Sequence, residues 1–176
     1  AVGERAVWVV NGGDASVSRV SLSDGSVQRI PVGLAPGGIG IVFGSVWLTA
    51  GKNTIWRLNP ETRQVDEIID VGGSPFGLTV GPDAVWATLP DTGTVVRIDP
   101  RRNQVVKRIR LGFKPLTIVV GPDAVWVAVA IVGFAACAFA FTRNATPAGT
   151  VTFIDNGGAI APGVTATTIK TNPVAT

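Results

Sequence analysis

A short motif ending in Val-Trp recurs through this chain at a nearly constant interval. At spacings of 39, 39 and 40 residues, the motif occupies Ala6–Trp8, Ser45–Trp47, Ala84–Trp86 and Ala124–Trp126. A proline recurs with the same period, at Pro36, Pro75 and Pro115. A period near 40 residues is typical of proteins that stack one structural unit repeatedly, because a single unit cannot bury its hydrophobic face alone. The chain is therefore expected to fold as an array of similar units.

Each repeat is rich in Val, Ile, Thr and Trp, and Gly, Pro, Asp and Asn divide it into short segments. These compositions predict strands separated by turns. In the third repeat the predicted strands are 77–80, 84–88, 94–99 and 104–111. Four strands in about 40 residues are typical of one blade of a β-propeller.

We therefore predict an all-β fold, a single β-propeller domain over 1–176. Its repeats are expected at about 4–44, 45–83, 84–123 and 124–176. In a propeller the strand that carries Val-Trp packs on the next blade. The four repeated tryptophans are accordingly predicted to be structural: Trp8, Trp47, Trp86 and Trp126.

The fourth repeat departs from the pattern. Its segment 149–155 resembles 93–99, but about 16 extra residues precede it. We expect an apolar insertion over about 129–148, within an uncharged run of 18 residues from Ala124 to Phe141. Membrane contact stays open but is not favoured. The first residues of the run belong to the predicted Val-Trp strand, and the apolar residues that remain are too few to span a bilayer. The insertion is expected to contact another protomer, through Ile131, Phe134, Phe139 and Phe141.

The two ends of the chain keep the phase of the repeat. When Pro173–Thr176 is joined to Ala1–Trp8, the distance from the proline to the valine of Val-Trp becomes ten residues, as in the other repeats. Val174 and Val2 would then belong to one strand and contribute to an oligomer contact. Three assemblies satisfy this pattern: a closed four-bladed ring, a swapped dimer with eight blades, and a head-to-tail filament. A fragment of a longer propeller is a fourth possibility.

The third repeat also resembles a known family. The run Thr94-Val95-Val96-Arg97-Ile98-Asp99-Pro100 is similar to the repeats of YVTN and streptogramin-lyase-like (virginiamycin B lyase-like) propellers. The resemblance covers residues 1–127 well and 149–176 more loosely. It implies a β-propeller, a fold that serves as enzyme, sensor, adhesin or scaffold. The lyases of this family use a histidine, an acidic residue and a divalent metal.

Composition argues against that chemistry here. The chain contains no histidine and one cysteine, so the family's catalytic histidine has no counterpart, and an intrachain disulfide or a cysteine-rich zinc site is excluded. We predict no catalytic residue, no metal and no cofactor. The net charge of +3 includes a basic cluster over 97–114. Without interleaved aromatic residues this cluster reads as a solvated sheet edge, and nucleic acid is not an expected partner.

Propellers usually bind ligands on the face that carries the loop after the Val-Trp strand and the loop before the repeated proline. The candidate binding residues on that face are Asn11, Asp14, Lys52, Asn53, Asp91 and Lys114. Asn144 begins an N-glycosylation sequon, which favours an extracytoplasmic location. The predicted function is a non-enzymatic binding or assembly module that forms homo-oligomers or binds another protein. A streptogramin-lyase-like enzyme and a sensor domain excised from a larger receptor are the alternatives.

Overall fold

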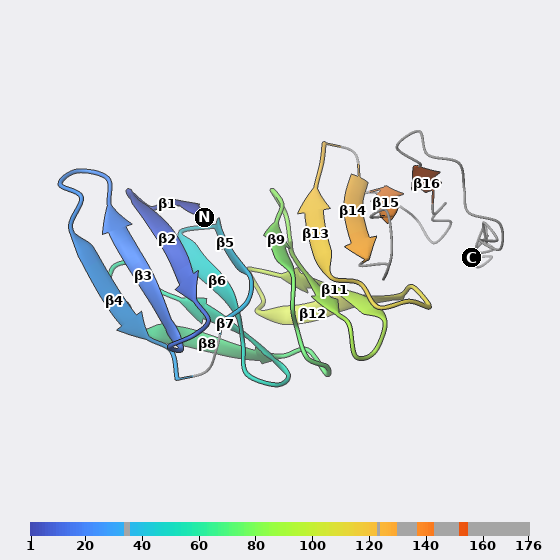
Figure 1. The fold of residues 1–176 in the computed structure, drawn as a ribbon, viewed down its shortest axis with the longest axis horizontal. Helices are drawn as coiled ribbons and strands as arrows, with labels where there is room; N and C mark the ends of the chain where they lie inside the picture. Colours follow the sequence, from blue (N-terminus) through green and yellow to red (C-terminus); the bar gives the residue numbers. More distant parts are fainter. Residues whose placement is uncertain (34–35, 123, 130–136, 143–151, 155–176) are drawn as a thin grey trace.

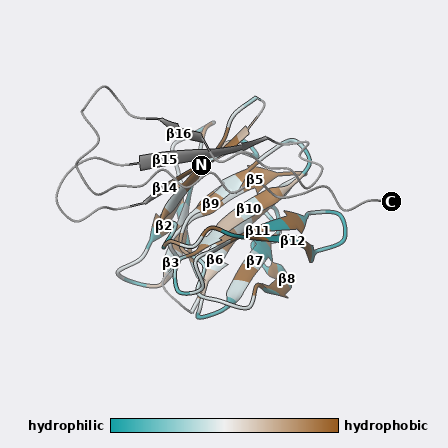
Figure 2. Cartoon of the chain, turned by 90° about the vertical axis from the view of Figure 1, so that its right-hand side faces the viewer, coloured by the Kyte–Doolittle hydropathy of each residue, from teal (hydrophilic) through white to brown (hydrophobic). Residues whose placement is uncertain are grey.

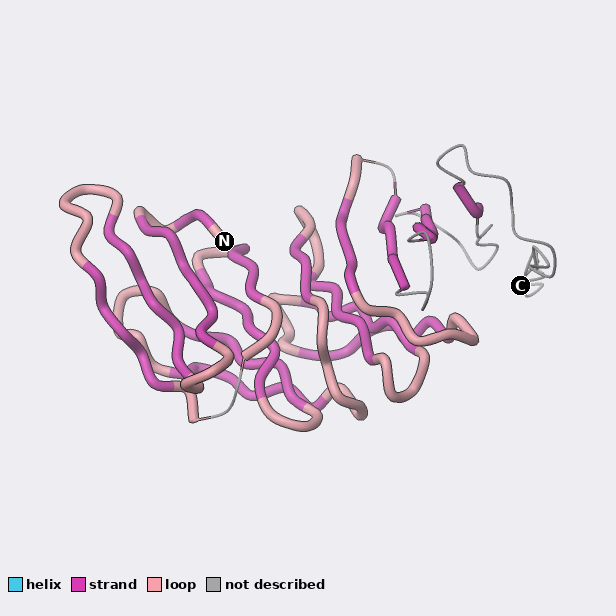
Figure 3. Tube along the Cα trace, in the orientation of Figure 1, coloured by secondary structure: helices cyan, strands magenta, loops and turns pink. Residues whose placement is uncertain are grey.

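The computed structural model describes residues 1–33, 36–122, 124–129, 137–142 and 152–154. Within these ranges the chain is all β, without a helix (Figure 3). It forms four antiparallel sheets of four strands each, and in every sheet the strands lie side by side in chain order (Figure 1). In the described part of the chain, no helix has the length and apolar character needed to cross a membrane.

The first sheet contains β1 (Val2–Gly3), β2 (Ala6–Asn11), β3 (Ser16–Ser21) and β4 (Val27–Pro31). The second contains β5 (Ile39–Val42), β6 (Ser45–Ala50), β7 (Thr54–Leu58) and β8 (Val65–Asp70). The third contains β9 (Leu78–Val80), β10 (Val85–Leu89), β11 (Thr94–Asp99) and β12 (Gln104–Arg110). The fourth contains β13 (Thr117–Val120), β14 (Ala124–Val129), β15 (Cys137–Thr142) and β16 (Thr152–Ile154). Each sheet begins one strand before its Val-Trp motif.

In the second and third sheets, the turn between the third and fourth strands is stabilised by the same pattern of hydrogen bonds. The side-chain oxygen of Asn59 accepts hydrogen bonds from the backbone N–H groups of Glu61 and Thr62, at 2.9 and 3.1 Å. Asp99 accepts from Arg101 and Arg102 in the same way, at 2.8 and 3.2 Å. An Asn or Asp that bonds backbone two and three residues ahead fixes a tight turn, and the proline that follows each of them presets φ. This is why these positions end one strand and begin the next.

The hydrophobic core consists of three clusters, each lying between two neighbouring sheets. Trp8 of the first sheet packs in one cluster with Val46 of the second. Trp47 of the second sheet packs with Val85 of the third, and Trp86 continues the pattern against the fourth sheet. The tryptophans of the first three Val-Trp strands thus face the following sheet, and the valines of the last three face the preceding one. Figure 2 shows apolar and polar residues alternating along these strands.

Glycines let the first strands of neighbouring sheets approach closely. Strand β9 lies against both β5 and β13. A Cβ atom on Gly77 would lie 2.4 Å from the carbonyl oxygen of Leu116, and one on Gly38 would lie 2.7 Å from the backbone nitrogen of Leu78. Both distances are shorter than real contacts allow, so only glycine fits. The four sheets consequently follow one another along a curved arc, with the first sheet at one end (Figure 1).

The fourth sheet differs from the arrangement expected from sequence. Its third strand is Cys137–Thr142, which pairs with β14 from Ala124 opposite Thr142 to Val129 opposite Cys137. The sequence had placed these residues in an insertion and assigned the third strand to 149–155. Part of that segment, Thr152–Ile154, is instead the fourth strand. Pairing within a sheet satisfies backbone hydrogen bonds that an apolar loop would leave without partners.

This register changes the position of two residues that were expected in an arm reaching a neighbouring protomer. Phe139 and Phe141 lie opposite Val127 and Val125 of β14, within the fourth sheet. Val2, expected at the contact between chain ends, lies in β1. Four further residues expected at an oligomer contact or at the sequon lie outside the described residues: Ile131, Phe134, Asn144 and Val174.

Candidate functional site

Two of the predicted binding residues take part in a network within the first sheet. The amide nitrogen of Asn11 donates to the hydroxyl oxygens of Ser16 and Ser18, at 3.0 and 2.8 Å. The Ser16 hydroxyl donates to Asp14 at 2.5 Å, and Arg29 forms an ion pair with the same carboxylate. These contacts hold the β2–β3 loop and leave Asn11 with a structural role.

A third predicted residue, Asp91, fixes a neighbouring loop. Its two carboxylate oxygens accept from the backbone N–H groups of Ser74 and Thr92, each at 2.9 Å. The remaining predicted residues, Lys52, Asn53 and Lys114, lie exposed on the β6–β7 and β12–β13 loops. The structure therefore gives Asn11, Asp14 and Asp91 partners within the fold.

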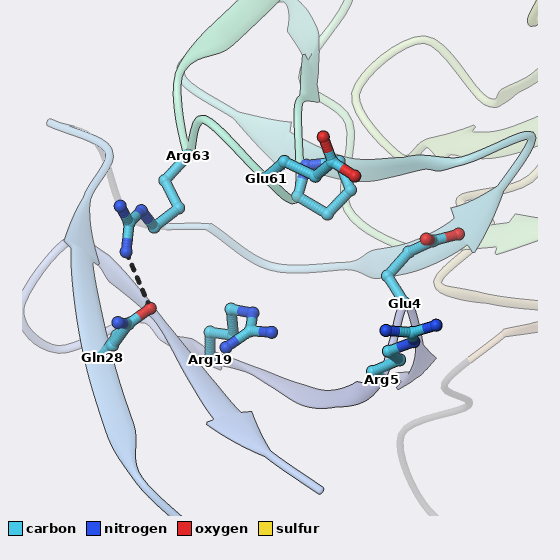
Figure 4. Close-up of a pocket in the computed structure, with 7 residues that line it drawn as sticks. Glu4, Arg5, Arg19, Gln28, Glu61 and Arg63 are labelled. Atoms are coloured by element: carbon cyan, nitrogen blue, oxygen red, sulfur yellow. Dashed lines mark hydrogen bonds between the residues drawn. The ribbon is translucent and has the colours of Figure 1, made fainter. Parts of the chain in front are cut away.

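A pocket lies between the first and second sheets, at the end of the strands opposite to the β2–β3 loop. It has a volume of about 540 Å³ and is lined by the β1–β2 turn, strands β3 and β4, and the β7–β8 turn. The residues that line it are Glu4, Arg5, Arg19, Gln28, Pro60, Glu61 and Arg63 (Figure 4). Sequence reasoning missed this pocket. The signal available was an arginine recurring in the third strand of each of the first three repeats.

That arginine lies opposite the tryptophan of the neighbouring strand. Arg19, Arg57 and Arg97 each face the Val-Trp tryptophan of their own sheet, with the guanidinium carbon 5.8 to 5.9 Å from the ring centroid. Arg57 also donates to the hydroxyl of Ser45 at 2.8 Å and to Asn103 at 3.3 Å. Arg97 forms an ion pair of 2.9 Å with Asp83.

Arg19 differs from its two counterparts. Among the described residues its guanidinium contacts the Trp8 ring but forms no hydrogen bond or ion pair. The side chain is only partly exposed and it lines the pocket. A half-buried guanidinium with unused donors is a group that an anion would satisfy.

A second feature of note is the outer face of the first sheet, which faces away from the second. One row of valines crosses all four strands: Val2 lies opposite Val7, Val7 opposite Val20, and Val20 opposite Val27. We call these four residues the valine row. Val2 is 70% exposed and Val27 is 65% exposed. On the same face, Val9 is 44% exposed.

The equivalent rows in the next two sheets are buried at their centres. In the second sheet the row runs through Val46 and Leu58, which are 0% and 1% exposed and pack on the first sheet. In the third sheet it runs through Val85 and Ile98, both 0% exposed and packed on the second sheet. The valine row therefore has the composition of an inter-sheet contact but lacks a neighbouring sheet among the described residues.

The comparisons with known proteins identify the fold. No family model matches the chain, and no curated protein sequence matches it. Among solved structures, the chain is similar to hydrazine synthase of Kuenenia stuttgartiensis, with a TM-score of 0.70 and 15% identity over 78% of this chain and 43% of that one. It is also similar to the dihydro-heme d1 dehydrogenase NirN in complex with DHE, with a TM-score of 0.61 and 10% identity over 85% of this chain and 42% of that one.

A third similar structure is apo AztD from Citrobacter koseri, with a TM-score of 0.59 and 11% identity over 80% of this chain and 42% of that one. These neighbours are β-propeller proteins, and the chain has a propeller-type fold. It spans less than half the length of each of the three. At such identities the likeness concerns the fold alone.

Proposed function

We propose that this chain is a non-enzymatic β-propeller module whose role is assembly, and that the outer face of its first sheet binds a second copy of the same chain. The single observation that carries the proposal is the valine row, in which Val2 and Val27 are exposed and Val7 and Val20 are half-buried. Its counterparts Val46 and Val85 are fully buried against a preceding sheet. Exposed apolar surface of this kind, when it repeats the pattern of an internal contact, marks an interaction site.

The opposite end of the arc supplies a matching surface. In the fourth sheet, Trp126 lies opposite Val119 of β13, and Val119 is 60% exposed. Within each of the first three sheets, the tryptophan face packs on the next sheet. We infer that the tryptophan face of the fourth sheet in one copy packs on the valine row of the other. Two copies joined at both ends would then form one ring with eight sheets.

The resemblance to YVTN and streptogramin-lyase-like repeats, and with it the family assignment, stays a prediction.

The innermost strand of the first sheet is part of the same proposal. The amino group of Ala1 donates to the carbonyl oxygen of Trp8, and the Trp8 N–H donates back to Ala1, both at 2.8 Å. In the second sheet Gly40 lies opposite Trp47, and the pairing reaches two positions further, to a hydrogen bond of 3.0 Å from Thr49 to Gly38. We propose that the partner copy completes this strand, so that it extends as far along β2 as the first strand of the second sheet extends along β6.

Two lysine substitutions at opposite ends of the arc test the assembly. Val9→Lys alters the outer face of the first sheet, and Val119→Lys alters the tryptophan face of the fourth. Both side chains are substantially exposed, at 44% and 60%, so neither change should unfold a subunit. Val106→Lys is the matched control, because Val106 is also 44% exposed but lies on β12, the last strand of the third sheet.

Molar mass is measured by light scattering during size-exclusion chromatography. The unaltered chain and Val106→Lys are expected to form dimers, whereas Val9→Lys and Val119→Lys are expected to be monomers. A mixture of the two monomeric variants retains one contact in which both surfaces are unchanged, and it should recover dimers. A monomeric unaltered chain, or a mixture that stays monomeric, would contradict the head-to-tail contact.

A further inference from the structure

We propose that the pocket between the first and second sheets binds a phosphorylated polyol such as a sugar phosphate, with Arg19 as the central contact to the phosphate. This inference is independent of the proposed assembly, because the pocket is formed within one chain. Its residues come from both sheets: the first supplies Arg19 and Gln28, and the second supplies Glu61 and Arg63. A volume of about 540 Å³ falls in the range of small-molecule sites.

Arg19 provides the anion contact. The face of the Trp8 ring supports its guanidinium at 5.9 Å from the centroid, which holds the planar group in one orientation. Its counterparts Arg57 and Arg97 use their donors on neighbouring side chains. In the described structure the Arg19 donors have no such partners. A guanidinium with two parallel free N–H groups matches two oxygens of a phosphate.

Two further arginines strengthen the positive potential of the pocket. Arg63 is held by a hydrogen bond of 3.0 Å from one of its terminal nitrogens to the Gln28 side chain, which leaves its other donors available. Figure 4 shows this bond, and it shows the Arg19 guanidinium directed across the pocket toward Arg5. Three arginines, one on β3 and two in the β1–β2 and β7–β8 turns, thus line one pocket. A dianionic group is the ligand whose charge they complement.

Two glutamates determine which chemical groups the ligand can carry beside its phosphate. Glu4 and Glu61 also line the pocket, and neither forms an ion pair with the three arginines in the described structure. A bare anion would be repelled by these carboxylates. A molecule that carries hydroxyl groups beside its phosphate can donate to them while the phosphate contacts the arginines. This combination favours a phosphorylated polyol over an inorganic anion.

The two-residue β1–β2 turn brings Glu4 and Arg5 to the rim of the pocket. Their φ values are 51° and 56°, and the equivalent residues of the β5–β6 turn, Phe43 and Gly44, have values of 50° and 65°. Positive φ at both central residues is the geometry of a tight hairpin turn. The first interface therefore differs from the second in the side chains that this turn carries.

The next interface shows what the same location looks like when it is closed. There Phe43 occupies the corresponding turn, and the guanidinium of Arg101 lies 5.7 Å from its ring centroid. Arg57, the counterpart of Arg19, is bonded to Asn103 across the two sheets at 3.3 Å. At the second interface these side chains contact one another, whereas at the first the charged side chains line a pocket.

Calorimetric titration tests the proposal with three probes: glucose 6-phosphate, inorganic phosphate and glucose. Glucose 6-phosphate is expected to bind, inorganic phosphate at least tenfold more weakly, and glucose undetectably. The variants are Arg19→Gln and Arg63→Gln, with Arg110→Gln as the control, because Arg110 is an exposed arginine on β12 far along the chain from the pocket. Arg19→Gln should weaken glucose 6-phosphate binding at least tenfold, and Arg63→Gln about threefold.

The variants also separate binding from folding. Arg19 packs on Trp8, so the thermal unfolding midpoint of Arg19→Gln is recorded by tryptophan fluorescence. Arg63 is exposed, and its variant should unfold at the same temperature as the unaltered chain. The proposal is overturned if glucose 6-phosphate does not bind, if glucose binds equally well, or if Arg110→Gln weakens binding as much as Arg63→Gln. Dimer formation, measured separately, does not enter any of these outcomes.

Discussion

The guanidinium of Arg97 lies 5.9 Å from the centre of the Trp86 ring, directly opposite it across strands β10 and β11. The first two sheets contain the same pair. An arginine over an aromatic face contributes about 0.5–1 kcal/mol at exposed sites and more where water is excluded. The recurring arginine of the repeat is therefore a structural partner of the recurring tryptophan. In the fourth sheet, alanine stands opposite the tryptophan, at position 140.

The tryptophans differ in how their ring nitrogens are satisfied, which predicts a difference between two conservative substitutions. The Trp8 ring nitrogen donates to the carbonyl oxygen of Gly3 at 3.3 Å, whereas that of Trp47 is buried without a hydrogen-bond partner. Replacing either by Phe leaves a cavity, but at Trp47 it also removes an unsatisfied donor. Trp47→Phe should therefore destabilise the chain by about 1 kcal/mol less than Trp8→Phe. Urea unfolding followed by circular dichroism measures both; an equal or larger loss at Trp47 would contradict the prediction.

Thr88 joins two sheets through a buried hydroxyl. Its oxygen accepts from the Gly77 N–H at 2.9 Å and donates to the Leu116 carbonyl at 2.8 Å. Thr88→Val keeps the shape but leaves two backbone groups without partners, so it should reduce the free energy of unfolding by about 1–3 kcal/mol. Thr88→Ser retains the hydroxyl and serves as the control, with a smaller loss from the missing methyl group. A Val variant as stable as the Ser variant would show that the hydroxyl contributes nothing.

The β1–β2 turn links stability to ligand binding. Because Glu4 and Arg5 both have positive φ values, the double substitution Glu4→Asn and Arg5→Gly should relieve backbone strain and stabilise the chain by about 1 kcal/mol. The same change removes two pocket residues, so it should weaken glucose 6-phosphate binding. Thermal unfolding and calorimetry on one preparation measure the two effects. A variant that is less stable, or that binds as tightly as the unaltered chain, would be the contrary result.

The pKa of Asp24, in the β3–β4 turn, predicts that the stability of the chain depends on pH in the acid range. Hydrogen bonds from the Ser21 hydroxyl and from the backbone and hydroxyl of Ser26 lower the pKa of Asp24 from 3.8 to about 2. Since the folded pKa is depressed, the stability that this carboxylate contributes is fully present above pH 3.8 and is lost as the pH falls through about 2. Ser26→Ala should raise the pKa toward 3.8. A carboxyl-carbon NMR titration measures it, and an unaltered chain that titrates near 3.8 would refute the assignment.

The regular part of the fold could be predicted because its signals are local. The expected strand at 94–99 is β11, and the one expected at 104–111 is β12 within one residue. Alternating β-branched residues, bounded by turn residues such as Asp99 and Pro100, carry that information within a few positions. The fourth sheet lacks such signals, since the apolar run around Cys137 contains no charge to mark a boundary. Its strand register depends on pairing with β14, which the local sequence does not encode.

The candidate site could not be predicted for a related reason. The recurrence of Arg19, Arg57 and Arg97 is visible in the sequence, but their partners are not. Asn103 reaches Arg57 across a separation of 46 residues, and no counterpart among the described residues reaches Arg19. Whether a recurring arginine is satisfied within the fold or open to a ligand is decided by the neighbouring sheet. The partners of the predicted loop residues are equally invisible in the sequence, since Asp14 pairs with Arg29 on β4 and Asp91 accepts a hydrogen bond from Ser74 of the β8–β9 loop.

The close approach at Gly38 and Gly77 also bears on stoichiometry. These glycines determine how near the first strands of adjacent sheets can come, and hence the angle through which each sheet is rotated relative to the last. An arc with unlike ends closes only when these rotations add up to a full circle. In the proposed assembly, the number of copies is thus a property of curvature rather than of the strength of the terminal contact. A larger residue at either glycine would open the angle, and it could convert a closed ring into an open-ended polymer without altering either terminal surface.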